Sequence, residues 1–554
     1  MKVLGNKLVL SFLAVLTVLC YSCGVNEPAT GGAAEVTSEP AVVETNQPGA
    51  KEPEAKGSVA EQTKTEKPEA AQTAIQQTKA SQPEAGPAVV AKKAEKSLVV
   101  EAPAEPNVVA KIGDYVVTRG ELEKRLMNEL RPDSYDYGTR TEPVDVNTVL
   151  MKMIAEKAMV IEAREQNYLQ REDIHTTVQR FKEKRLAGLL LQAHIQSKQD
   201  ELIVTDSEID GVLKANSKLD RVRARALLQG EKVSRVLDQY YDELCKKFHV
   251  QKLSDNFTKT AQLYQRLLYR PKEPREVGWV RVSQIKDELT PEEKNIVLAK
   301  YDGGKVTSKD WFDAVSEMSP PSRPRDLGAA KGVERLLDRA LRLPILVAEA
   351  MLEQLDKDED LVKQVREDED RRLLGEMMST KNKEVKEPTD EQIAAYFEKN
   401  KEVFGTPATL KIDQIWCQDL TSARKARTEL EGGKDFESVK RTYSLHKEAK
   451  PFNTYPGNEA MFWADLWKGD PNEVVGPLKG FQGDGIKWRI VKIFEKKPGE
   501  VKEYSDDMKN RTKWKMMDER RQAVLADYRK QLLRKHSYEI YADRIKDINP
   551  LDIP

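Results

Sequence analysis

Residues 109–122 read Val109-Ala-Lys-Ile-Gly-Asp-Tyr-Val-Val-Thr118-Arg-Gly-Glu-Leu122, and a similar stretch reads Leu298-Ala-Lys-Tyr-Asp-Gly-Gly-Lys-Val-Thr307-Ser-Lys-Asp-Trp-Phe312. The two stretches align without a gap. Each predicts a short strand pair joined by a turn that contains glycine. Thr118 and Thr307 precede runs with apolar residues at helical spacing, so each threonine is predicted to cap the start of a helix. This hairpin-then-helix pattern decides the fold of the chain.

Two further similarities follow at nearly the same separation along the sequence. Within a helical pattern, Ile161-Glu-Ala163 matches Ala348-Glu-Ala350. Further on, Val204-Thr-Asp-Ser-Glu-Ile209 matches Pro388-Thr-Asp-Glu-Gln-Ile393, and each opens another helix. Because all three matches keep their spacing, they indicate one internal duplication rather than chance.

Amphipathic helices are predicted to make up most of both copies. One stripe at helical spacing is formed in the first copy by Leu150, Met153, Ile154, Lys157, Ala158 and Ile161, and one in the second by Leu336, Leu337, Ala340, Leu341, Ile345 and Val347. Charged stretches with periodic Leu and Met predict further long helices that bury one face. These lie at 176–203, 227–248, 356–386 and 505–534. The predicted fold class is therefore mainly α.

The N-terminus predicts export. Lys2 and Lys7 precede an apolar run, Leu8 to Leu19. This run is short for a membrane span but fits a secretory signal. Ser22 then precedes Cys23, which resembles a bacterial lipobox. That resemblance implies a signal peptide over 1–22 and a lipid on Cys23, which would hold the protein to the periplasmic face of a bacterial membrane or to the outer cell surface. An uncleaved membrane anchor is the alternative.

Residues 23–106 are predicted to form a flexible tether. They consist largely of Ala, Glu, Lys, Pro, Thr and Gln, with almost no aromatic residues. Such a composition buries too little apolar surface to offset the entropy lost on ordering. A tail that binds a partner is the alternative.

The overall charge excludes some classes of function. The chain has 91 basic and 92 acidic residues. That balance argues against a nucleic-acid partner, which calls for a basic excess. The sequence shows no metal-ligand spacing, phosphate loop or catalytic triad, so we expect no metal and no cofactor. Cys245 and Cys417 are expected to be small core residues, although one disulfide between them is chemically allowed in this compartment.

The first copy resembles the N-terminal chaperone domain of the SurA and PrsA type, through its Val-Ala-Lys-x-Gly-Asp-x-x-Val-Thr start and its later Thr-Asp-x-x-Ile step. After the second copy, about residues 406–497 resemble a parvulin (PpiC-type) peptidyl-prolyl isomerase domain. The markers are Thr406-Pro407, Gly433-Lys-Asp-Phe436, Tyr443-Ser444, Val475-Gly-Pro-Leu478 and Trp488-Arg-Ile-Val-Lys-Ile493. The resemblance implies helical units over 107–290 and 291–404, a small α+β domain with a four-stranded antiparallel sheet over 405–498, and a helix and strand over 499–554 that pack back on the chaperone unit.

The resemblance also locates a candidate site. Parvulins place two histidines across a cleft beside a Cys or Asp, and these positions fall here at Gln414, Arg489 and His446. The peptide-binding side chains carried over are Met461, Phe462, Trp463 and Trp488. Because an amide and a guanidinium replace the imidazoles, we expect weak or absent isomerase activity.

Together these features predict a lipid-anchored extracytoplasmic folding factor that binds unfolded or newly translocated polypeptides. Two alternatives stay open: an active isomerase with an altered site, and a structural envelope lipoprotein that uses the small domain for docking. The sequence does not indicate an oligomeric state.

Overall fold

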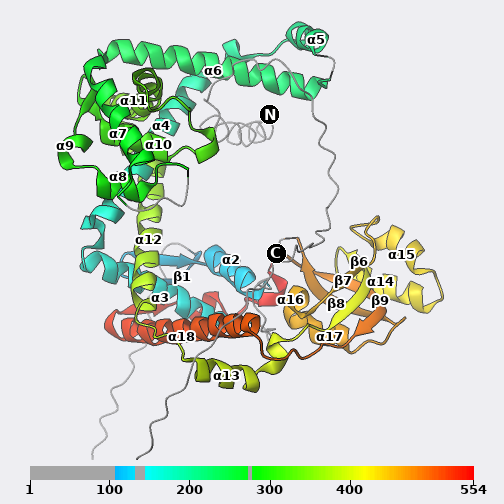
Figure 1. The fold of residues 1–554 in the computed structure, drawn as a ribbon. Coiled ribbons are helices and arrows are strands. Elements are labelled where there is room, and N and C mark those ends of the chain that lie inside the picture. Colours follow the sequence, from blue (N-terminus) through cyan, green and yellow to red (C-terminus); the bar gives the residue numbers. More distant parts are fainter. Residues whose placement is uncertain (1–105, 132–143, 217, 273–277, 484, 554) are drawn as a thin grey trace, which may run out of the picture. The chain divides into compact units, whose positions relative to one another are not determined.

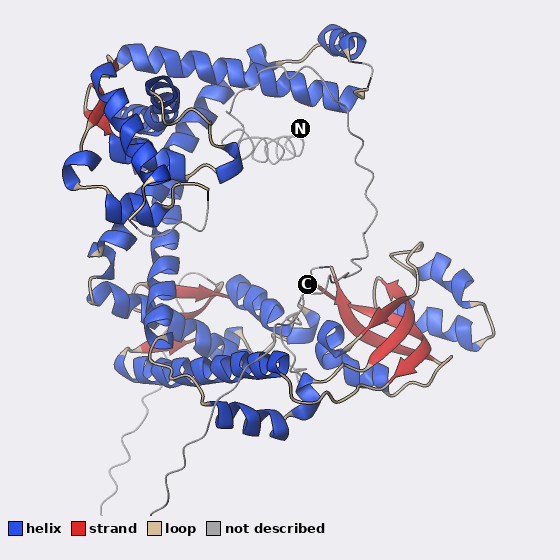
Figure 2. Cartoon of the chain, viewed as in Figure 1, coloured by secondary structure: helices blue, strands red, loops and turns tan. Residues whose placement is uncertain are grey.

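The computed structural model describes residues 106–553 except 132–143, 217, 273–277 and 484. The predicted signal peptide, Cys23 and nearly all of the predicted tether lie outside the described residues. Helices dominate the described part, and its strands form three antiparallel sheets (Figures 1 and 2). Among these residues, no helix is both long enough and apolar enough to span a membrane.

The two predicted hairpins form with the same register. The first joins β1 (Val108–Ile112) to β2 (Tyr115–Thr118), and the second joins β4 (Val297–Tyr301) to β5 (Gly304–Thr307). Ala110 faces Val117 just as Ala299 faces Val306, and both pairings slip by one residue at the same point. The equivalent registers confirm the duplication.

Each hairpin takes its third strand from the chain just after a long helix. Strand β10 (Tyr538–Ile540) follows α18 (Asp506–Lys535) and pairs with β1. Strand β3 (Gln251–Lys252) follows α6 (Arg221–Lys247) and pairs with β4. The first sheet therefore joins both ends of the described chain, whereas the second sheet closes within a much shorter stretch.

The remaining helices of the two units have the following bounds: α2 (Arg119–Leu130), α3 (Val146–Glu165), α4 (Glu172–Ser197), α5 (Asp206–Ala215), α7 (Phe257–Tyr269), α8 (Val282–Glu288), α9 (Pro291–Lys294), α10 (Ser308–Ser316), α11 (Ala330–Leu352), α12 (Glu359–Asn382) and α13 (Asp390–Lys399). Helix α3 packs against α12 and α18 in a first core, to which α2 and β1 also contribute. A second core is built from residues 257–341, on both sides of the predicted boundary at 290. A third core joins α4 and α6 to α11 and α12.

The small domain contains the predicted four-stranded antiparallel sheet. Its strands are β6 (Thr409–Cys417), β7 (Phe452–Thr454), β8 (Val474–Gln482) and β9 (Gly485–Lys497), in the order β7-β6-β9-β8. Helices α14 (Leu420–Glu431) and α15 (Phe436–Tyr443) pack on one set of strand residues. The short helices α16 (Pro456–Glu459) and α17 (Trp463–Trp467) follow β7, and α17 packs on a second set. Since neighbouring strand residues point to opposite faces, the sheet has a core on each side.

Matched capping contacts offer a test of the duplication. The Thr118 backbone N–H donates to the Glu121 carboxylate at 2.8 Å, and the Thr307 N–H donates to Asp310 at 2.7 Å. We predict that Glu121→Ala and Asp310→Ala each cost about 1 kcal/mol. Hydrogen exchange should rise only in the hairpin and helix of the altered copy.

Glu123→Ala serves as the control, because Glu123 makes a half-buried one-turn pair with Arg119 and takes no part in the capping box. It should cost about 0.5 kcal/mol or less. Faster exchange in both copies from either single change would contradict two separately capped units.

Candidate functional site: the cleft positions of the small domain

The two predicted cleft positions on the strands, Gln414 and Arg489, lie side by side. Strands β6 and β9 run antiparallel, with Trp416 opposite Arg489. The Arg489 guanidinium reaches along the sheet and donates from Nη1 to the Gln414 side-chain oxygen at 3.0 Å. The structure therefore brings these two predicted positions into contact.

The Arg489 guanidinium is buried and ion-paired. Only 2% of the residue is exposed. Its Nη2 donates to Oε2 of Glu459 at 2.5 Å, and the Thr454 hydroxyl donates to the other Glu459 oxygen at 2.7 Å. The guanidinium carbon also lies 5.0 Å from the centre of the Trp416 ring. These contacts hold the cation in one orientation.

A glycine on the neighbouring strand makes room for this arginine. A Cβ placed on Gly480 would lie 2.5 Å from both Cζ and Nε of Arg489. Any larger residue at 480 would therefore collide with the guanidinium. One donor of the guanidinium, Nε, has no hydrogen-bond partner within the described part of the chain.

A second buried ion pair lies nearby in the same domain. The Lys440 ammonium on α15 donates to both oxygens of Asp413 on β6, at 2.7 and 2.8 Å, and both side chains are 1% exposed. The ammonium also donates to the Ala449 carbonyl. The pair ties α15 to the sheet, and it leaves neither charge available for a ligand.

His446 lies apart from this buried network. It is exposed, and its Nε2 contacts the side-chain amide of Gln482 on β8. Its backbone N–H donates to the Ser444 hydroxyl oxygen at 3.2 Å. Among the described residues, no hydrogen bond joins His446 to Gln414 or Arg489. The structure thus brings together two of the three predicted cleft residues.

The four predicted peptide-binding side chains do not gather on one surface. Trp463 stacks on Trp467, with ring centres 5.3 Å apart, and packs against one face of the sheet. Trp488 packs against the core on the helix-covered face.

The remaining two candidates lie elsewhere. Phe462 is buried and meets Phe481 edge-on, with ring centres 5.0 Å apart. Met461 packs against the first core of the helical part. All four side chains have packing partners within the chain, so their observed contacts are structural.

This arrangement bears on the chemistry of the site. Rotation about a peptide bond has a barrier of roughly 18–20 kcal/mol. Lowering that barrier calls for an apolar pocket and for polar groups that favour the twisted amide. Here the guanidinium of Arg489 is already bound to Gln414 and Glu459. A guanidinium also keeps its proton at all ordinary pH values, so it cannot exchange protons as an imidazole does.

Sequence reasoning missed Glu459, Lys440 and Asp413. All three are charged residue types that usually face solvent. Glu459 lies in a four-residue helix with no motif around it. The one available signal was the arginine at position 489 itself, because a buried arginine requires a carboxylate partner.

The two cysteines do not form a disulfide. Both are free: Cys417 is buried in the small domain and Cys245 is half-buried on α6. Burial raises the pKa of the Cys417 thiol to about 11, and the nearby Asp419 carboxylate adds to the shift. Cys417 is therefore a small, protonated core residue, as expected from its apolar neighbours.

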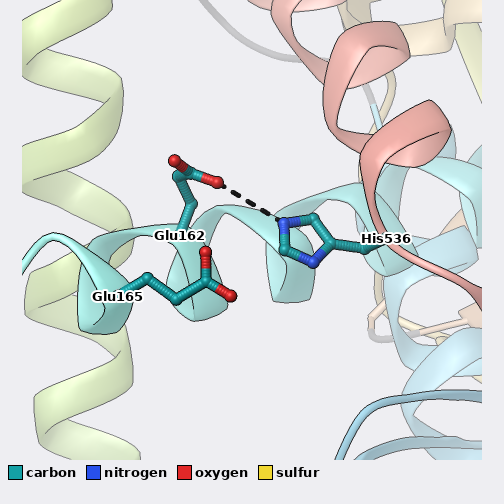
Figure 3. A group of neighbouring side chains, drawn as sticks. All are labelled: Glu162, Glu165 and His536. Carbon is teal, nitrogen blue, oxygen red and sulfur yellow. Dashed lines mark hydrogen bonds and ion pairs between the residues drawn. The ribbon is translucent and has the colours of Figure 1, made fainter.

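Figure 3 shows a group outside the small domain that has ligand-like spacing. Glu162 and Glu165 on α3 lie near His536, which follows α18, and their ligand atoms lie within 4.8 Å of one another. The Lys535 ammonium, however, pairs with Glu162 at 2.5 Å and with Glu165 at 3.0 Å. A cation is thus already supplied by the protein, so the group is explained as an ion-pair cluster that fastens α18 to α3.

Comparison with known families identifies the class of the small domain. An antiparallel four-stranded sheet flanked by short helices carries the candidate cleft positions on its two central strands. Residues 388–509 match the family model described as the PPIC-type PPIase domain. This part of the chain is a PPIC-type peptidyl-prolyl isomerase domain.

The solved structures with partial similarity include SurA-like chaperones and PrsA proteins. A SurA-like chaperone of Campylobacter jejuni is 13% identical, with a TM-score of 0.23, over 44% of this chain and 98% of that one. PrsA of Bacillus subtilis is 19% identical, with a TM-score of 0.14, over 46% of this chain and 98% of that one. PrsA of Bacillus anthracis is 16% identical, with a TM-score of 0.19, over 34% and 86%. No curated protein matches the chain.

The buried pair of Arg489 and Glu459 predicts a large effect of one substitution. Glu459→Gln removes the charge at nearly constant size and leaves Arg489 buried without a counter-ion. We expect a loss of about 3–5 kcal/mol of unfolding free energy, measured by urea denaturation. Asp465→Asn, in an exposed pair with Lys468 in the same domain, should cost about 1 kcal/mol or less. Equal losses of unfolding free energy in the two variants would contradict a larger contribution from the buried pair.

The cluster in Figure 3 predicts a pH dependence. Burial alone raises the pKa of Glu162, but hydrogen bonds from Lys535, Gln166 and His536 outweigh it, so the folded pKa lies below the usual glutamate value of 4.5. A lowered pKa stabilises the fold above the unfolded value, and this contribution is lost as the pH falls through the folded pKa.

Lys535→Met should therefore destabilise the protein at neutral pH, and the difference from the parent should shrink as the pH falls below 4.5. Denaturation over a pH series measures this. Lys530→Met is the control, since Lys530 is exposed and pairs only loosely with Asp527. A difference that stays constant with pH would contradict the assignment.

Proposed function

We propose that this chain is a lipid-anchored extracytoplasmic folding factor that holds unfolded polypeptides, and that its PPIC-type domain has weak or no isomerase activity. The proposal combines a duplicated helical body with a small domain that retains the family fold. The lipid would be attached at Cys23, and the segment over 23–106 would let the folded part work away from the membrane surface.

The state of Arg489 is the observation that carries the proposal for the small domain. The resemblance places a catalytic histidine at this position, and the chain has a buried guanidinium there, bound to Glu459 and Gln414. The ion pair fills the position with a fixed charge. A cleft of this kind favours neither proton exchange nor an apolar proline ring.

Exposed apolar side chains support client binding by the helical part. Several large ones are more than half exposed: Ile203, Val222, Tyr269, Val282, Leu352, Val362 and Trp514. They lie on different helices and at their ends rather than in one patch. Dispersed apolar contacts of this kind suit a binder of many different unfolded segments, which needs adaptable rather than shape-specific contact.

Two assays on the same protein test the proposal. We expect the chain to suppress aggregation of a chemically unfolded outer-membrane protein, and to show little or no turnover in a protease-coupled prolyl isomerisation assay. Gln414→His with Arg489→His examines whether restoring imidazoles is sufficient for turnover. We expect that it is not, because Glu459 would remain buried beside them.

The alternatives correspond to other outcomes of these assays. Turnover by the parent protein that Gly480→Leu abolishes would favour an active isomerase with an altered site. Absence of both client holding and turnover would favour a docking role in the envelope. Labelling with a fatty-acid analogue, with and without Cys23→Ala, tests the anchor: equal labelling would overturn it.

A further inference from the structure

The connection between α11 and α12 carries an unusual combination of side chains. We call residues 351–363 the acidic corner. Met351 and Leu352 end α11 and are 45% and 63% exposed, and Val362 in the first turn of α12 is 54% exposed. The ends of the two helices meet at the short connection between them, where Ala350 and Leu361 are buried in one core, so the three exposed side chains stand around the same connection.

The acidic corner has an uncompensated negative charge. Glu353, Asp356, Asp358, Glu359 and Asp360 stand against Lys357 and Lys363, so five acidic and two basic residues give a net charge of −3. None of the five carboxylates has an ion pair within 4.0 Å in the described part of the chain. Lys357 donates instead to the Gln354 side-chain oxygen at 2.9 Å.

Several carboxylates further along α12, by contrast, form ion pairs. Asp368 pairs with Arg371 and Arg372, at 3.1 and 2.6 Å. Further along the helix, Glu369 and Asp370 both pair with Arg164 of α3, and Glu376 pairs with Arg171. The carboxylates at 368–370 and 376 of α12 are thus paired, whereas those at the corner, like the exposed Glu367, have no ion pair within 4.0 Å in the described part of the chain.

Helix capping explains some of these carboxylates but not all. Asp358 accepts the Leu361 backbone N–H at 2.8 Å, and Glu359 and Asp360 lie in the first turn of α12, where negative charge is favourable. Glu353 instead follows the C-terminus of α11, where the helix dipole disfavours a negative charge. Asp356 caps no long helix.

The residues next to the exposed side chains of the acidic corner are packed in the third core. Ala350 and Leu361, which flank the exposed residues, are buried in the third core together with Leu346. Leu355 packs against the same core. The exposed apolar side chains therefore stand on a fixed base, so a ligand would not have to order this surface on binding.

We propose that the acidic corner is a docking site for client segments that combine Lys or Arg with apolar side chains. This inference rests on the proposed function and names the class of client segment. Apolar groups of the segment would cover Met351, Leu352 and Val362, and its cations would meet the unpaired carboxylates. Charge complementarity selects this occupant over an acidic or a neutral segment.

The test uses full-length protein and two labelled peptides of equal length, one alternating Leu with Lys and one alternating Leu with Glu. We expect the Lys peptide to bind at least about tenfold more tightly than the Glu peptide, and to weaken as ionic strength rises. Glu353→Gln with Asp356→Asn should weaken the Lys peptide several-fold. Met351→Ser with Leu352→Ser should weaken it as well. Met351, Leu352 and Glu353 are exposed and Asp356 is half-buried, so none of the four changes removes a fully buried side chain.

Val222→Ser with Leu227→Ser is the matched control. Both side chains are exposed on α6, but the neighbouring charges are paired, with Arg221 bound to Asp206 and Asp210. This variant should bind the Lys peptide like the parent. Equal binding of both peptides, or equal loss in the control and corner variants, would overturn the proposed site.

A photo-crosslinking residue at position 352 identifies what covers the corner during client holding. Crosslinks to the unfolded outer-membrane protein support the proposal. Crosslinks only to a second copy, or only to residues 23–106 of the same chain, would overturn it. Aggregation suppression that persists in the corner variants, without a charge preference, would reject this site while leaving the proposed function intact. Absence of any client holding would reject the proposed function itself.

Discussion

The first core of the helical part is completed by the last helix of the chain. Leu525 and Leu532 of α18 pack among side chains of α2 and α3, and β10 adds a strand to the hairpin of β1 and β2. More than three hundred and fifty residues separate these partners, as the pair of Lys535 with Glu162 illustrates. Because buried apolar area provides most of the stability of such a core, the first unit depends on residues at both ends of the described chain. The second unit, by contrast, closes locally through α6 and β3.

The chain continues differently after the two copies of the duplicated unit. Both copies have the same hairpin and both reach a capped Thr-Asp step, in which Thr205 pairs with Glu208 and Thr389 with Gln392. After the first step the chain continues into α5 and α6, and it thereby supplies the closing helix of the other unit. After the second step it continues into the PPIC-type domain and then into α18. Each closing helix therefore follows a Thr-Asp step, and only one of the two intervals contains an inserted domain.

The sequence allowed the local part of this architecture to be predicted, and little of the long-range part. Hairpins, caps and amphipathic helices follow from residue patterns within a few turns. The positions of Thr118 and Thr307 were therefore sufficient to predict where the two capped helices begin. Gln414 and Arg489 lie on neighbouring strands but are not opposite each other, and their hydrogen bond forms because the long Arg489 side chain reaches along the sheet. The burial of Lys440, Asp413 and Glu459 could not be predicted, since a charged residue is buried only when a partner from another element meets it. The positions of the four candidate peptide-binding residues likewise depend on tertiary packing, which places Trp463 and Trp488 in clusters on opposite sides of the sheet.

The buried ion pair of Arg489 and Glu459 links a central strand of the small domain's sheet to α16. Burying a guanidinium and a carboxylate has a desolvation cost that their attraction only partly offsets, so such pairs contribute structural specificity more readily than stability. Hydrogen bonds among Arg489, Glu459, Gln414 and Thr454 together connect β6, β7, β9 and α16. These contacts involve Gln414 and Arg489, the two strand positions that the resemblance assigns to the cleft. Because the guanidinium is bound to partners within the chain, these side chains hold the strands and α16 together as structural contacts.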